Sequence, residues 1–161
     1  MKVVEELKVM SDERFLALYT DLSQHGFGPL DGEVAQRLKF RPQAIRKLPL
    51  AQRAKHAKAI LVARGQAELC YELFGSWLIK ERRELVTGFL DGTGVPHEDG
   101  MLEDLEHNRP DVKKLAGVVK DLDAKFAPED VTLYLALCAE QWPLPELDAL
   151  WRSRSAAGQP A

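Results

Sequence analysis

Apolar side chains recur every three or four residues along most of the chain, which is the spacing of one face of an α-helix. The clearest case is the set Phe15, Leu18, Tyr19 and Leu22, which follows Ser11, a residue type that often caps the first turn of a helix. No stretch alternates between apolar and polar residues convincingly enough to predict a β-strand. The pattern therefore predicts an all-α fold.

Proline and glycine divide this pattern into separate helices. After the helix that follows Ser11, the predicted helices cover residues 32–40, 42–48, 50–64, 67–90, 110–126 and 128–142. A short acidic helix is expected after Gly100, and a short last helix begins at Pro145. The segment 67–90 is apolar over more than half of its circumference, so we expect it to lie at the centre of the fold.

The chain resembles itself when it is shifted by 68 positions. Residues 13–72 and 81–140 then share twelve identical residues over 60 aligned positions. Two of the shared pairs are Asp-Gly at 31–32 and 99–100, and Arg-Pro at 41–42 and 109–110. Asp-Gly suits a turn before a helix, and proline suits the first helical position. The sequence therefore predicts one helical domain, residues 1–153, made of two similar halves, with a flexible tail at 154–161.

Length and composition favour a folded protein in the cytoplasm. The chain has 161 residues, of which 45% are apolar and 29% are charged. No apolar run approaches the ~18 residues that a membrane span requires, so no membrane partner is expected. Glu5 and Glu6 interrupt the position where a signal peptide would be apolar.

Charge is distributed unevenly along the chain. Between residues 34 and 67 there are nine arginines and lysines and no acidic residue. Residues 13–72 carry ten basic and six acidic side chains, a net charge of +4, whereas residues 81–140 carry seven basic and fourteen acidic side chains, a net charge of −7. Such an asymmetry indicates either a polyanionic partner or two surfaces that attract each other.

The stretch "DGEVAQRLKFRPQAIRKL", residues 31–48, resembles the helix-turn-helix of DNA-binding proteins. A small residue, Ala35, lies four positions before the turn at Lys39, and apolar residues flank the turn. The resemblance implies that a helix beginning at Pro42 enters the major groove and that its base-facing residues are Gln43, Ala44, Arg46 and Lys47. The candidate nucleic-acid or partner-binding residues are Arg37, Lys39, Arg41, Arg46, Lys47, Arg53, Lys55 and Lys58.

Three features favour a packing role for the same stretch. Lys39 occupies the turn position where glycine is usual, and Pro49 shortens the second helix to about two turns. The equivalent stretch after Gly100 is acidic, so a phosphate backbone would repel it. Nucleic-acid binding through the basic, helix-turn-helix-like segment 31–64 is therefore the alternative interpretation rather than the leading one.

Residues 97–107, "HEDGMLEDLEH", contain the densest set of potential metal ligands. The candidates are His97, Glu103, Asp104 and His107. On a helix, Asp104 and His107 would share a face, as in the acid-x-x-His motif of carboxylate-bridged metal sites. That motif is required twice, and the first half of the chain has Gln36 and Lys39 at the matching positions. A metal-dependent enzyme is therefore only a third interpretation.

No other pattern predicts a reaction or a bound cofactor. Cys70 and Cys138 occupy equivalent positions of the repeat, on apolar helical faces, and we interpret both as buried thiols. We expect a non-enzymatic interaction or regulatory protein, whose partner is a protein and for which a second copy of the chain is one candidate. The two equivalent loops, 25–32 and 94–100, are the favoured places for function.

Overall fold

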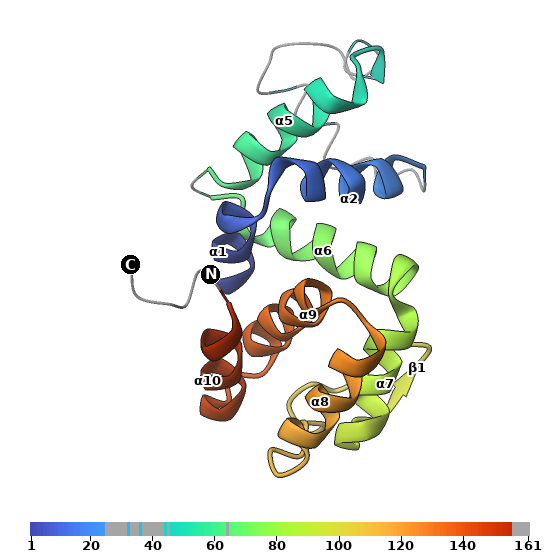
Figure 1. Cartoon of the computed structure of the whole chain (residues 1–161), viewed down its shortest axis with the longest axis vertical. Helices are drawn as coiled ribbons and strands as arrows, with labels where there is room; N and C mark the ends of the chain where they lie inside the picture. The colour runs from blue at the N-terminus through green and yellow to red at the C-terminus, as the bar shows by residue number, and fades with distance from the viewer. Residues whose placement is uncertain (25–31, 33–35, 37–43, 45, 64, 156–161) are drawn as a thin grey trace. The chain divides into compact units, whose positions relative to one another are not determined.

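The structure, a computed structural model, describes residues 1–24, 32, 36, 44, 46–63 and 65–155 (Figure 1). Its helices are α1 (Lys2–Val9), α2 (Asp12–Gln24), α5 (Leu50–Leu61), α6 (Ala67–Glu81), α7 (Arg83–Thr93), α8 (Leu115–Lys125), α9 (Pro128–Gln141) and α10 (Pro145–Arg154). Within these residues, extended backbone pairs only in β1 (His97–Glu98) and β2 (Met101–Leu102). The all-α prediction is confirmed. None of the described helices is both long and apolar enough to cross a membrane.

The chain forms two compact units. Unit 1 comprises Met1 and Val3–Trp77, and unit 2 comprises Lys2 and Leu78–Ala161. The boundary falls between the two halves that the sequence predicts, 13–72 and 81–140. That residues 1–153 form a single domain stays a prediction.

Unit 1 is organised around the packing of α2 against α5. The predicted N-cap is confirmed, because Ser11 Oγ accepts a hydrogen bond of 3.1 Å from the backbone N–H of Arg14. The apolar face that the spacing predicts for α2 is also the face that is buried. The buried residues of α2 are Phe15, Leu18, Tyr19 and Leu22. The buried apolar residues of α5 are Ala54, Ala57, Ile60 and Leu61.

Unit 2 is organised around α9, which contacts α8 and α10, while α7 contacts α8. Every residue of α9 from 130 to 139 is buried, so this part of the helix has no face in solvent. The one carboxylate in that stretch, Asp130, accepts a hydrogen bond of 2.8 Å from Arg82 Nε. A charge buried to this degree requires such a partner, and the arginine at the start of α7 supplies it.

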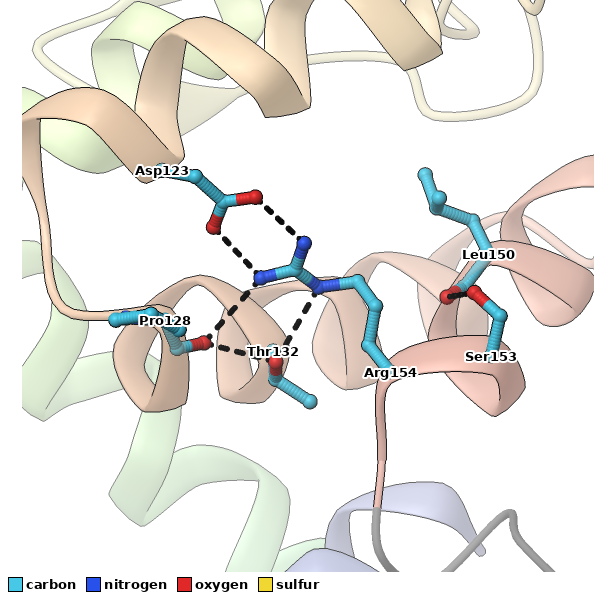
Figure 2. Close-up of polar contacts among 6 residues, drawn as sticks. All are labelled: Asp123, Pro128, Thr132, Leu150, Ser153 and Arg154. Atoms are coloured by element: carbon cyan, nitrogen blue, oxygen red, sulfur yellow. Dashed lines mark hydrogen bonds and ion pairs between the residues drawn. The ribbon is translucent and has the colours of Figure 1, made fainter.

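An arginine at the end of α10 links three helices of unit 2 (Figure 2). The two terminal nitrogens of Arg154 each donate to one oxygen of Asp123 on α8, at 2.7 Å. Its Nε donates to Thr132 Oγ1 on α9 at 3.3 Å, and Thr132 itself donates to the carbonyl of Pro128 at 2.8 Å. A lysine could not reproduce this two-pronged geometry.

These contacts correct the predicted tail. Residues 154 and 155 were expected to belong to a flexible segment, but Arg154 is the last residue of α10 and Ser155 is 1% exposed. The basic, serine-rich composition of this stretch gives no indication that a carboxylate of α8 lies within reach. Residues 156–161 lie outside the described residues.

The predicted long helix 67–90 is interrupted at Arg82, where α6 gives way to α7. The backbone of Arg82 has φ −133° and ψ 39°, which is not helical. No proline or glycine stands at this position, so the sequence pattern predicted one continuous helix across it. The interruption coincides with the ion pair of Arg82 with Asp130 and a hydrogen bond from Arg82 Nη1 to the carbonyl of Glu81.

The acidic helix predicted after Gly100 is wrong. Residues 97–102 form a β-hairpin in which Glu98 pairs with Met101. The two residues of its turn, Asp99 and Gly100, have φ of 51° and 88°, as a type I′ turn requires. Asp-Gly therefore makes a hairpin turn here rather than the approach to a helix.

The predicted helix start at Pro110 is also wrong, since α8 begins at Leu115. The intervening chain is tied to its neighbours by backbone groups. Asp111 N–H donates to the carbonyl of Thr93 at 3.0 Å, and Trp142 Nε1 donates to the carbonyl of Asn108 at 3.1 Å. These contacts hold the segment in a non-helical path until Leu115, the first buried residue of α8.

The internal duplication stays a prediction. Gly32 and Gln36 are helical, whereas their counterparts at 100 and 104 lie in the hairpin and in a turn. The two halves therefore differ locally at the glycine of the shared Asp-Gly. Residues 25–31, 33–35 and 37–43, which contain the rest of the first loop and most of the helix predicted after it, lie outside the described residues.

Candidate functional site

Unit 1 contains a hollow between α2 and α5, with a volume of about 260 Å³. Its apolar lining comes from Phe15 and Leu16 on α2 and from Ala51 and Ala54 on α5. Four charged residues complete it: Asp12, Glu13, Lys55 and Lys58. We call this hollow the α2/α5 groove. It lies just below the usual size of small-molecule sites, ~300–1,000 Å³, which suits the insertion of one or two side chains.

One ion pair ties the two helices together beside the groove. Lys58 Nζ donates to Asp12 Oδ1 at 2.9 Å and to the backbone carbonyl of Met10 at 2.6 Å. Lys58 therefore has an internal role, and its charge is matched by Asp12. The other cation of the groove, Lys55, is exposed, and its side chain makes no hydrogen bond or ion pair with a described residue.

The structure divides the predicted basic residues into two groups. Arg53 is 9% exposed, and its guanidinium carbon lies 5.6 Å from the centre of the Tyr19 ring, so it belongs to the core together with the internally paired Lys58. By contrast, Arg46, Lys47 and Lys55 are exposed, with side chains that pair with none of the described residues. We call these three the cationic edge. The remaining candidates, Arg37, Lys39 and Arg41, lie outside the described residues.

The structure describes the end of the helix-turn-helix-like stretch. Ala44 and Arg46 are helical, Lys47 lies in a turn, and α5 starts at Leu50 directly after Pro49, so the predicted interruption at Pro49 is confirmed. Residues of the resemblance from 31 to 43 lie outside the described residues, apart from Gly32 and Gln36.

The predicted metal ligands form two separate pairs in unit 2. His97 Nδ1 accepts the backbone N–H of Gly100 at 3.0 Å, and His97 Nε2 lies 2.6 Å from Asp91 Oδ1. In the neutral ring the proton is therefore on Nε2, which donates to Asp91. His97 thus holds the hairpin turn against the end of α7, which is a structural role.

The second pair, Asp104 and His107, does not share a helix face as predicted. Asp104 has φ 50° and lies in a turn, where its carboxylate is 2.8 Å from His107 Nδ1. Glu103 contributes its backbone carbonyl to Asn108 Nδ2 at 3.0 Å. Across the ranges that the structure describes, no three histidine, cysteine or acidic side chains converge on one point. Metal binding at 97–107 stays a prediction without geometric support.

Both cysteines are buried free thiols, which confirms the sequence interpretation. Burial raises the pKa of Cys70 to about 12, and burial also raises the pKa of Cys138. Neither is therefore a thiolate near neutral pH, and neither is poised to act as a nucleophile.

The α2/α5 groove was missed from the sequence, since it arises from how two helices pack. One signal did exist in the sequence of α5. The small side chains of Ala51 and Ala54 lie on neighbouring turns, beside the cation Lys55, at positions where larger apolar residues would close the gap. The hairpin signal was also present in Asp99-Gly100. Comparison of the chain with protein-family models, curated proteins and solved structures found no match.

Proposed function

We propose that the protein is a non-enzymatic interaction protein that binds an acidic protein partner through unit 1. The observation that carries this proposal is the set of exposed cations that have no partner among the described residues, of which Lys55 lies at an apolar groove. Arg46 and Lys47, which precede α5 in the chain, add two more cations of the same kind. Glu13 also lines the groove, exposed and without a described partner, so it balances Lys55 there. The excess positive charge therefore comes from Arg46 and Lys47. Exposed cations together with an apolar hollow suit a surface that offers acidic and apolar side chains.

Nucleic acid is the second candidate partner, favoured by the nine cations and the absence of acids between 34 and 67. Two observations favour a protein partner over nucleic acid. Arg53 and Lys58 are used inside unit 1, which removes two of the expected phosphate contacts. The lining of the groove by Phe15 and Leu16 also offers nothing to a phosphate backbone.

Fluorescence anisotropy with labelled polyglutamate and with a labelled DNA duplex tests the proposal. The wild-type chain is expected to bind polyglutamate, and the triple variant Arg46→Ala/Lys47→Ala/Lys55→Ala to lose at least about tenfold in affinity. The control Lys113→Ala/Lys114→Ala/Lys120→Ala removes the same charge from exposed positions of unit 2 and is expected to bind as the wild type does.

An equal loss of polyglutamate affinity in both triple variants would show a general charge effect and refute a site at the cationic edge. Preferential binding of the duplex, with an affinity that falls about 10³-fold or more between about 50 and 200 mM salt, would favour the nucleic-acid interpretation instead.

A further inference from the structure

The β-hairpin of unit 2 has an inner and an outer side. Successive side chains of a strand point to opposite sides, and residues paired across two strands share a side. His97 pairs with Leu102, and Glu98 pairs with Met101. The side of His97 is the inner one, because His97 Nε2 contacts Asp91 near the end of α7. The outer side is therefore formed by Glu98 and Met101, which are both exposed, and we call it the hairpin face.

Met101 gives the hairpin face an apolar centre. It is 59% exposed, the highest value among the large apolar residues that the structure describes. A methionine side chain is flexible and polarisable, and it is common at surfaces that bind partners. A partner that covers Met101 removes apolar surface from water, which favours binding.

Negative charge lies beside this methionine. Glu98 is directly across the hairpin from it, Asp99 is in the turn, and Glu103 follows β2. All three are exposed, and their side chains make no hydrogen bond or ion pair with a described residue. Residues 97–108 contain five acidic residues and no arginine or lysine, and Arg109, the next cation along the chain, balances at most one of them. The negative charge at the hairpin face is therefore not balanced within the loop.

The loop is held in shape before any partner arrives. His97 Nδ1 accepts the backbone N–H of Gly100 at 3.0 Å, which fixes the turn. Trp142 Nε1 donates to the carbonyl of Asn108 at 3.1 Å, which fixes the far end of the loop. Since the loop is already ordered, little conformational entropy is lost when a partner covers Met101.

We propose that the hairpin face binds an arginine- or lysine-rich segment of a protein partner. Such side chains combine an apolar stem with a charged head group. The stem covers Met101 while the head group pairs with Glu98 or Asp99, so that one side chain of the partner matches both features of the face. The acids repel a carboxylate or a phosphate, and a purely apolar segment would desolvate them without compensation. The hairpin face belongs to unit 2 alone, so this inference goes beyond the proposed function and does not depend on it.

Fluorescence anisotropy of a labelled oligoarginine peptide, titrated with the full chain, tests the inference. The wild type is expected to bind the peptide. Met101→Ser is expected to weaken binding at least about threefold, because the apolar contact with the arginine stem is lost while no charge changes. Met101→Leu keeps an apolar side chain and should bind as the wild type does. A Met101→Ser variant with wild-type affinity would overturn the proposal.

Charge variants locate the contact. Glu98→Gln/Glu103→Gln is expected to weaken oligoarginine binding at least about tenfold. Its control, Glu129→Gln/Glu146→Gln, removes the same charge from exposed positions in the first turns of α9 and α10 and should bind normally. All four side chains are exposed, so each variant is expected to keep the melting temperature of the wild type. If the control loses as much affinity as Glu98→Gln/Glu103→Gln, the hairpin face is not the site.

The triple variant of the cationic edge separates this inference from the proposed function. It leaves the hairpin face intact, so it is expected to bind oligoarginine at least as tightly as the wild type does. A loss of oligoarginine binding in that variant would overturn the assignment to the hairpin face. If oligoarginine binding is independent of Met101 while polyglutamate binding depends on the cationic edge, only the present inference fails.

Discussion

Replacing Arg154 by alanine removes the contact that joins α8, α9 and α10 at one point. Two hydrogen bonds of 2.7 Å to Asp123 are lost, together with the bond to Thr132. The side chains of Arg154 and Asp123 are 18% and 32% exposed, so the pair is neither buried nor fully in water. Exposed pairs contribute up to about 1 kcal/mol, and removing one partner of a buried pair costs about 3–5 kcal/mol.

An intermediate loss of about 2 kcal/mol is therefore expected for Arg154→Ala. At roughly 2–4 °C per kcal/mol for a chain of this size, the melting temperature should fall by about 4–8 °C. Arg154→Lys should recover only part of the loss, because an ammonium cannot bond both carboxylate oxygens in the same plane. Urea unfolding followed by tryptophan fluorescence and by circular dichroism measures the change in the free energy of unfolding.

Arg152 provides the matched control two residues earlier on α10. It is 52% exposed on its side chain and bonds Asp148 at 2.9 Å, which lowers the pKa of that carboxyl group. A double-mutant cycle of Arg154→Ala with Asp123→Ala should give a coupling free energy of about 1–2 kcal/mol. A loss of unfolding free energy for Arg154→Ala no larger than that for Arg152→Ala, or a coupling free energy of zero, would refute the role of this contact.

Three further predictions concern packing and reactivity. Gly92→Ala should destabilise the fold by about 1–3 kcal/mol, because the new Cβ would lie 2.8 Å from Val118 Cγ2. Gly117→Ala should stabilise it by about 0.5–1 kcal/mol, because a Cβ there has nothing within 4 Å. Melting temperatures that move in the same direction for both variants would contradict this. Arg53→Ala should destabilise unit 1 measurably in urea, while Lys55→Ala should stay within about 0.5 kcal/mol, and equal effects would refute their division into core and edge. Cys70 and Cys138 should react with a disulfide reagent at pH 8 only as the chain unfolds, since burial raises both pKa values, that of Cys70 to about 12, so that rapid labelling of the native chain would contradict the burial.

Part of the site could be anticipated from the sequence. The concentration of cations between 34 and 67 is a property of composition, and it led to eight candidates, of which Arg46, Lys47 and Lys55 are exposed in the structure. The role of Arg53 was not visible, because a buried arginine over Tyr19 and an exposed one in solvent occupy the same kind of position on a helix. Only the partner helix distinguishes them.

Local physical chemistry determined the class of fold. Helical spacing in α2, the Ser11 cap and the interruption at Pro49 depend on residues within a few positions of one another, and the structure bears out all three. Such effects act within a single turn of the chain, so they can be recognised before any tertiary contact is known.

Tertiary contacts decided what local patterns left undetermined. The end of α6 at Arg82, the late start of α8 and the fixed loop around Met101 each depend on partners such as Asp130, Thr93 and Trp142. Those partners lie roughly 20 to 50 residues away in the chain, and helical periodicity contains no information about them. The α2/α5 groove is of the same kind, since a hollow is the space that two packed helices fail to fill, and neither helix specifies it alone.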